Sequence, residues 1–390
     1  MTDYSGVHDV TAALKNTLAA MGVTAPDIGQ PLNEALLLGI GGGLGAGYLM
    51  FQFQSHGSAA ILVMGFRNRW NYMTESMSNT LDRLNIAYDI HETSGQKGAL
   101  TALRDAVAAN LPVITWADKA HLPYQALPER LKGHSAQIVA VHAFDGEIAH
   151  VSDLAPALWT VAAADLAAAR AQIPSDKNRI LVVHSVQPFD LQEAVRAGIT
   201  DHIEHLSRDS ETFSVPVWKK WARLINDRKN KKSWHVMFAE RKGLLQTLSD
   251  VYEGIRHDGT DGAGLRALYA DFLDQAEVLL DQPRLKDAAT AYRAAAQAWI
   301  AFAESALPAN VPAFADRAAT IDARYAALNT NNVQEVQRIA SLLEDQSSAA
   351  KSEFPLDDAG VDDLFADMQT KLNAVYDTEV AALAALTTAV

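Results

Sequence analysis

The chain of 390 residues contains no cysteine. This absence excludes disulfide bonds, thiolate metal sites and a cysteine nucleophile together. Basic residues are also scarce: 33 lysines and arginines stand against 47 aspartates and glutamates, so the formal net charge is −14. Because a nucleic-acid backbone repels an acidic surface, a nucleic acid is not an expected partner.

Long apolar segments are missing as well. No run of apolar residues reaches the roughly 18 that a membrane-spanning helix needs. The first residues lack the basic and apolar regions of a signal peptide. We therefore expect a cytoplasmic protein that has no membrane partner.

The composition is that of a globular protein, with 49% hydrophobic and 21% charged residues. A chain of this length can form two or three domains with cores of their own.

The first 187 residues predict an α+β domain with an antiparallel sheet. A helical stripe over residues 9–21 has Asp9 where an N-cap belongs and Gly22 just after its end. Apolar strands on both sides of Asp145-Gly146 predict a hairpin. The expected strands span residues 59–66, 87–93, 112–118, 136–144, 147–153 and 179–184, and further helices span 67–84 and 96–109. Helices followed by hairpin-joined strands are typical of α+β folds.

From about residue 189 no strand pattern remains. The expected helices span residues 189–207, 216–228, 233–257, 262–281, 284–305, 311–326, 332–346 and 361–387. We therefore predict an all-α domain over residues 188–390, after a first domain over residues 1–187.

Six glycines fall within the nine residues 39–47. Glycine is costly inside helices and strands, so such a run indicates tight turns or close backbone approach. A phosphate loop does not fit, because no strict G-x-G-x-x-G occurs and no Lys-Ser/Thr follows. We interpret the run as a buried or half-buried backbone segment beside a site.

Two stretches suggest acid–base chemistry. Gly133-His134 lies at the mouth of the predicted hairpin and Asp153 at its far end, so the paired strands bring them close. A histidine oriented by an aspartate is half of an acyl-transfer triad, although a hydrogen-bonded core histidine shows the same pattern. In papain-type folds the nucleophile lies at the start of an early helix, which here is His8-Asp9.

At this point the sequence resembles the butirosin biosynthesis protein H family. The resemblance is carried by His8-Asp9 and its helix, Glu34, the glycine run to Tyr48, Glu92-Thr-Ser94, Pro112-Val113, Asp118, Leu122-Pro-Tyr124, Leu127-Pro-Glu129, Gly133-His134, Trp234, residues 266–273 and Trp299. It spans roughly residues 5 to 305. It implies a papain- or C39-peptidase-like domain followed by the family's helical domain. It also implies transfer of an acyl group from a carrier protein to an amine.

The family pattern has a histidine followed by a nucleophilic cysteine at the helix start, where this chain has His8-Asp9. A carboxylate is a far poorer nucleophile than a thiolate, so covalent thioester exchange is in doubt. Three interpretations of Asp9 stay open: a helix N-cap, an acid, base or amine anchor acting with His134 and Asp153, or a metal ligand with His134 or His8.

The sequence thus predicts an acyltransferase-like protein with an altered nucleophile position. The alternative is a catalytically inactive protein that keeps the cleft for a ligand or partner. The predicted catalytic residues are Asp9, His134 and Asp153, and the predicted substrate-binding residues are His8, Glu34, Gly41, Gly42, Gly43, Asp118 and Tyr124. We expect no cofactor and no resident metal. The expected partners are a small-molecule substrate and an acyl carrier protein, and a homodimer is one arrangement that the sequence allows.

Two further features have a plain structural alternative. His202 and His205, spaced i, i+3, could clamp a metal, but an exposed helix face explains them as well. The basic run Arg228–Lys232 could dock an acidic carrier protein, or could simply be a solvated helix end.

Overall fold

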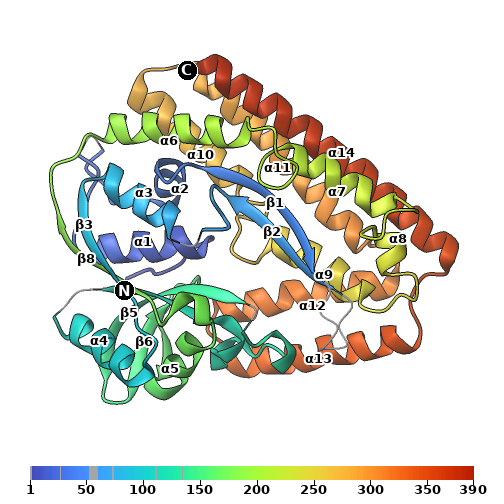
Figure 1. Cartoon of the computed structure of the whole chain (residues 1–390), viewed down its shortest axis with the longest axis horizontal. Coiled ribbons are helices and arrows are strands. Elements are labelled where there is room, and N and C mark those ends of the chain that lie inside the picture. The colour runs from blue at the N-terminus through green and yellow to red at the C-terminus, as the bar shows by residue number, and fades with distance from the viewer. Residues whose placement is uncertain (1, 27, 52–59, 73, 110–111, 134) are drawn as a thin grey trace. The chain divides into compact units, whose positions relative to one another are not determined.

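The computed structural model describes residues 2–26, 28–51, 60–72, 74–109, 112–133 and 135–390 (Figure 1). The chain forms two compact units, each built from three separate segments. The first unit comprises Met1–Leu37, Thr80–Leu191 and Ala323–Ser341, and the second comprises Leu38–Asn79, Gln192–Asp322 and Leu342–Val390. The predicted division between residues 187 and 188 stays a prediction.

The first unit is built on a six-stranded sheet in the order β3-β8-β4-β5-β6-β7. All of its neighbouring strands run antiparallel. The strands are β3 (Ile86–His91), β4 (Val113–Asp118), β5 (Ala136–Asp145), β6 (Ile148–Ser152), β7 (Trp159–Ala162) and β8 (Ile180–Val186). Every residue of β4 is buried, because the strand is central and covered by helices.

Among the described residues, three helices lie entirely within this unit and pack on β4: α1 (Asp9–Ala20), α4 (Gln96–Ala108) and α5 (Ala163–Ala171). Helix α1 ends as expected, since Gly22 has a φ of 73°. The N–H groups of Gly22 and Val23 bond back to the carbonyls of Ala19 and Leu18, as in a Schellman motif. At the other end the prediction of an Asp9 N-cap is wrong: His8 is the N-cap and Asp9 is the first helical residue.

The second unit combines a two-stranded antiparallel ribbon with helices. The ribbon pairs β1 (Leu44–Phe51) with β2 (Ile61–Arg67). The helices are α6 (Leu191–Leu206), α7 (Pro216–Asn226), α8 (Trp234–Met237), α9 (Leu244–Arg256), α10 (Arg266–Leu280), α11 (Leu285–Ala306) and α14 (Asp358–Ala389). The long helix α14, red in Figure 1, lies along α7 and α11.

Among the described residues, five helices contribute to both units: α6, through its first residue Leu191, and α2 (Glu34–Ile40), α3 (Glu75–Arg83), α12 (Pro312–Asn329) and α13 (Val333–Ser352). Short 3₁₀ turns span Lys119–His121, Pro123–Gln125, Glu129–Leu131 and Pro174–Asp176. None of the helices in the described part of the chain has both the length and the hydropathy to cross a bilayer.

A buried ion pair stands at the centre of the second unit. The Nε atom of Arg266 donates to Oε1 of Glu379 over 2.5 Å, and both side chains have no exposed area. The Arg266 guanidinium also lies over the rings of Phe66, Trp218 and Trp299. The predicted all-α region therefore closes around an aromatic core that also includes residues of β2.

The glycine run covers the end of α2, a turn, and the start of β1. Gly39 lies in α2, Gly42 and Gly43 form a turn with φ values of 104° and 69°, and β1 begins at Leu44. A Cβ atom at Gly45 would lie 2.1 Å from the backbone oxygen of Arg67 on the paired strand. The glycines thus permit a left-handed turn and a very close strand pair, and strand β1 itself was not predicted.

The predicted α+β class is confirmed: the N-terminal region carries the sheet and the C-terminal part is mostly helical. The expected helix over residues 67–84 is wrong in its first half, because Arg67 ends β2 and α3 begins only at Glu75. The window 233–257 contains two helices, α8 and α9, separated by Gly243 in a left-handed conformation.

Candidate functional site

Asp9 opens helix α1 and faces the start of strand β5. Its Oδ1 atom accepts from the N–H of Val10 over 2.8 Å, and its Oδ2 atom accepts from the N–H of Ile138 over 3.3 Å. The Asp9 side chain keeps 20% of its area exposed, while that of His8 keeps 7%. Asp9 is therefore an oriented carboxylate that solvent can still reach.

Asp153 follows strand β6 and is buried. Its Oδ2 atom accepts from the Tyr124 hydroxyl over 3.0 Å and from Nε2 of Gln125 over 3.1 Å. Its Oδ1 atom accepts from Nε2 of Gln137 over 2.7 Å. Burial raises the pKa of Asp153, the nearby Lys119 ammonium opposes that rise, and the charge of Asp9 adds to it.

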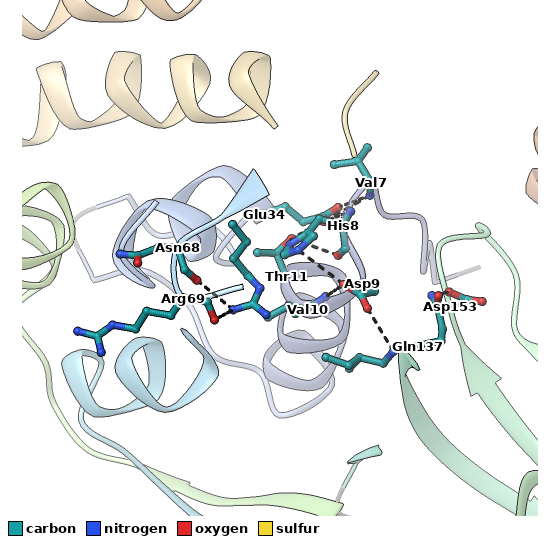
Figure 2. Close-up of polar contacts among 12 residues, drawn as sticks. Val7, His8, Asp9, Val10, Thr11, Glu34, Asn68, Arg69, Gln137 and Asp153 are labelled. Carbon is teal, nitrogen blue, oxygen red and sulfur yellow. Dashed lines mark hydrogen bonds and ion pairs between the residues drawn. The ribbon is translucent and has the colours of Figure 1, made fainter. Parts of the chain in front are cut away.

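Gln137 lies between the two carboxylates. Its side chain bonds to Asp153, and the next residue, Ile138, donates its N–H to Asp9. Figure 2 shows Gln137 between Asp9, at the start of α1, and Asp153. The structure thus brings Asp9 and Asp153 to the same end of β5, with an uncharged amide between them. His134, the predicted base, lies outside the described residues.

Glu34 and His8 hold the chain just before α1 in place. The Glu34 carboxylate accepts from the backbone N–H of Val7 and His8 and from the hydroxyl of Thr11, the last over 2.8 Å (Figure 2). Burial raises the pKa of Glu34, and the Thr11 hydrogen bond is the largest opposing effect. The Thr11 hydroxyl also lies 3.3 Å from Nδ1 of His8 and 3.2 Å from the backbone oxygen of His8. These two residues are placed to orient Asp9.

Asp118 and Tyr124 are buried beneath the surface. Asp118 has no exposed side-chain area, bonds to Nδ1 of His121, and accepts from the N–H of Ser135. The Tyr124 ring stacks on Trp159 with centroids 4.3 Å apart. Burial, together with Asp153, raises the pKa of Tyr124 well above its usual range. Contact of either residue with a substrate stays a prediction.

Gly41, Gly42 and Gly43 belong to the second unit and are buried there. A Cβ atom at Gly42 would lie 2.5 Å from Nδ2 of Asn68, and one at Gly43 would lie 2.6 Å from the ring of Tyr269. Backbone geometry and packing account for these glycines, and a substrate role for them stays a prediction.

The metal clamp suggested for His202 and His205 does not form. Nδ1 of His202 accepts from the N–H of Leu44 over 3.1 Å, and its Nε2 lies 2.6 Å from the Tyr292 hydroxyl. Neither ring nitrogen of His202 is therefore available. Across the described residues, no group of three or more histidines and acidic residues is arranged to hold a metal ion.

Two family models match consecutive parts of the chain. The N-terminal domain of butirosin biosynthesis protein H matches residues 8–154, and a domain of unknown function (DUF4872) matches residues 164–347. The chain belongs to the butirosin biosynthesis protein H-like family. This match confirms the resemblance seen in the sequence, and it covers Asp9, Gln137 and Asp153. No curated protein matches this butirosin H-like chain with significance.

Gln137, Gln125 and Lys119 were not among the predicted site residues of this butirosin H-like protein. Gln137 could have been noticed, since it is the only polar residue in the run Ala136–Val141. A polar side chain on a buried strand needs a partner, and here the partner is Asp153. Gln125 and Lys119 lie in short turns, where polar residues are ordinary and give no such signal.

Proposed function

We propose that this butirosin H-like protein binds a cationic small molecule, such as a primary amine, at Asp9 and does not transfer an acyl group to it. The observation that carries the proposal is Gln137. In an acyl-transfer triad the residue that bonds to the buried carboxylate is the base that takes the proton of the nucleophile. Among the described residues, the partners of Asp153 are the amides of Gln137 and Gln125 and the hydroxyl of Tyr124, and none of them is a base that takes up a proton.

The charge pattern supports an amine as the ligand. Asp9 is a partly exposed carboxylate, and its charge raises the pKa of the nearby Asp153. Two neighbouring carboxylates disfavour each other's ionised form, and an ammonium group beside Asp9 would relieve that repulsion. The family's implied acceptor is also an amine, so the proposed site keeps one half of the implied reaction.

We also propose that the first unit has a papain- or C39-peptidase-like fold. What supports this is the packing of α1 on β5 of an antiparallel sheet, with Asp9 at the start of the helix. In such folds the nucleophile occupies that helix start.

The test introduces a cysteine nucleophile at position 9 and a histidine base at position 137. The variants are Asp9→Cys, Gln137→His, and the two combined, each treated with a thioester probe and followed by mass spectrometry. Nε2 of His8 already lies 3.6 Å from Oδ1 of Asp9, so the single variant Asp9→Cys has one imidazole near the thiol. We expect clearly faster acylation of the introduced cysteine in the double variant, because there a second imidazole, oriented by Asp153, can take the thiol proton. Equal acylation rates in Asp9→Cys and the double variant would show that another residue, such as His8 or His134, is the base, and the proposal would be wrong.

Binding is tested on the unmodified chain. Calorimetric titration with a small set of primary amines should give heat for the wild type and a large loss of affinity for Asp9→Asn. Asp3→Asn is a matched control, because Asp3 is an exposed aspartate in the same N-terminal region. Affinities that are equal in the wild type and Asp9→Asn would place amine binding elsewhere.

A second candidate is acyl transfer without a covalent intermediate, in which Asp9 anchors the amine while an acyl carrier protein presents the thioester. The family match favours it, and exposed lysines at positions 229, 231 and 232 offer a basic surface to an acidic carrier. Incubation of the wild type with a short acyl thioester and an amine would yield an amide under this candidate and none under the first.

A further inference from the structure

Arg324 lies near the C-terminal end of α12 and belongs to the first unit, with the sheet. Only 2% of the residue is exposed. Its Nη2 atom donates to the backbone oxygen of Gln125 over 2.9 Å and lies 3.2 Å from the side-chain oxygen Oε1 of the same residue. A buried guanidinium therefore holds both carbonyl groups of Gln125.

The Gln125 carboxamide has a donor end and an acceptor end, and the two ends bond to different partners. Its Oε1 accepts from Arg324, and its Nε2 donates to Oδ2 of Asp153 over 3.1 Å. Arg324 has no acceptor to offer, so it can bond only to the oxygen end. The nitrogen end must then face Asp153.

We propose that Arg324 is a positioning residue for the Asp9–Asp153 site, which fixes the Gln125 amide so that Asp153 is held as a carboxylate. The inference rests on the proposed function only in treating this site as the functional one. It needs no ligand, so it can be tested apart from amine binding.

Several groups around Asp153 act on its pKa besides the Gln125 amide that Arg324 holds. Among the described residues, its titratable neighbours are Tyr124 and Lys119 from two 3₁₀ turns and Asp9 from α1. Burial raises the pKa of Asp153, and Lys119, Tyr124 and Gln137 each oppose the rise. If the Gln125 amide turned over, its oxygen would face the carboxylate. That contact favours the protonated acid, because only the acid can donate a hydrogen bond to an oxygen.

Arg324 and Asp153 lie in parts of the chain that match different family domains. Asp153 lies in the part matched by the butirosin protein H domain, whereas Arg324 lies in the part matched by the domain of unknown function. A residue of the second family domain thus completes the hydrogen bonding of Gln125, which itself bonds to Asp153 in the first.

The experiment is a pH titration of the full chain by NMR, with aspartate labelled at the carboxyl carbon and the Asp153 signal assigned by its loss in Asp153→Asn. In Arg324→Met we expect the pKa of Asp153 to rise by about one unit, because the amide is free to turn. The matched control is Arg338→Met, which changes an exposed arginine of the same segment that pairs with Glu335. The control should leave the Asp153 signal unchanged.

A double-variant comparison separates positioning from the simple charge of Arg324. In a Gln125→Leu background, Arg324→Met should no longer move the pKa of Asp153, because the amide that transmits the effect is gone. A shift of the same size in both backgrounds would show that Arg324 acts by charge alone and would overturn the inference.

If Arg324→Met does not fold, Arg324→Lys gives the readout. Lysine keeps the charge but offers a single donor group to Gln125, so the expected pKa of Asp153 lies between those of the wild type and the freed amide. An Asp153 pKa that stays at the wild-type value in every folded Arg324 variant would overturn the inference. Amine binding with no pKa change would leave the proposed function standing and remove only the role of Arg324.

Discussion

Each unit buries a carboxylate, and the two carboxylates are held in different ways. Glu379, in the second unit, bonds to Arg266 over 2.5 Å and to Nε1 of Trp299 over 2.7 Å. Asp153, in the first unit, bonds to a hydroxyl and two amides, all uncharged. One carboxylate is paired directly with a cation, and the other depends on neutral donors.

The difference separates a structural role from a chemical one. A fully enclosed ion pair holds its charges at fixed positions, and its loss leaves one buried charge without compensation. A buried carboxylate that has only neutral hydrogen-bond donors lacks a directly paired cation to offset the effect of burial. Its pKa therefore stays raised and responds to charges placed nearby. Asp153 is therefore suited to sense Asp9 and its ligand, whereas Glu379 is suited to hold α14 against α10.

The largest expected effect breaks the ion pair. Arg266→Met should lower the free energy of unfolding by about 3–5 kcal/mol, since Glu379 is left buried and unpaired. Urea unfolding followed by tryptophan fluorescence measures the loss. Arg293→Met is the matched control, because Arg293 of α11 forms exposed pairs with Asp271 and Asp274 of α10, the helix that carries Arg266. That control should change stability by less than about 1 kcal/mol. Similar losses in the two variants would contradict the structural role of the buried pair.

The next effect concerns the close backbone contact beside this pair. The Gly45 carbonyl accepts from Nη2 of Arg266 over 3.1 Å, and a Cβ atom there would meet the Arg67 carbonyl. Gly45→Ala should destabilise the chain by about 1–3 kcal/mol, because a rigid backbone atom must move. Thermal unfolding measures it against Gly98→Ala, a helical position with open space around it. The control should be neutral or stabilising by about 0.5–1 kcal/mol, and a stable Gly45→Ala variant would refute the close packing.

The third effect is the pH dependence that Asp153 brings to stability. Its folded pKa is raised, so the folded chain holds this proton more tightly than the unfolded chain. The contribution is present at pH values below about 4, where an unfolded aspartate is protonated, and is lost as pH rises through the folded pKa. One pKa unit corresponds to about 1.4 kcal/mol. The stability of the wild type relative to Asp153→Asn should therefore fall as pH rises over that window, and a pH-independent difference would argue against the raised pKa.

The smallest effect tests the chain just before α1. Thr11→Val removes the hydroxyl that donates to Glu34, so the pKa of Glu34 should rise further and stability at neutral pH should fall by about 1 kcal/mol. Thr101→Val is the control, since Thr101 is exposed on α4 and bonds only within its helix. Denaturation curves at pH 7 compare the two, and equal losses would mean that the Thr11 contact to Glu34 adds nothing.

Much of the secondary structure followed from local patterns. The stripe of apolar residues placed α1, the hairpin turn placed β5 and β6, and the alanine-rich windows placed most later helices. Strand β1 was not predicted, because its glycines do not show the alternating pattern of a strand. The close pairing with β2 accounts for these glycines. The sequence pointed to Asp9 and Asp153, which the structure brings to the same end of β5, and it gave Gln137 no role. Its choice of His134 as the base stays a prediction.

By itself, the sequence determined the α+β class, the family, the lack of any cysteine and the presence of a carboxylate at the start of α1. Only the tertiary structure decided that Gln137 separates Asp9 from Asp153 and that Arg324 reaches Gln125 across 199 positions of the chain. The physical reason is the separation along the chain between the residues that interact. Helix and strand periodicity is set by neighbouring residues, whereas hydrogen bonds between distant side chains depend on strand register and packing, which no local pattern records.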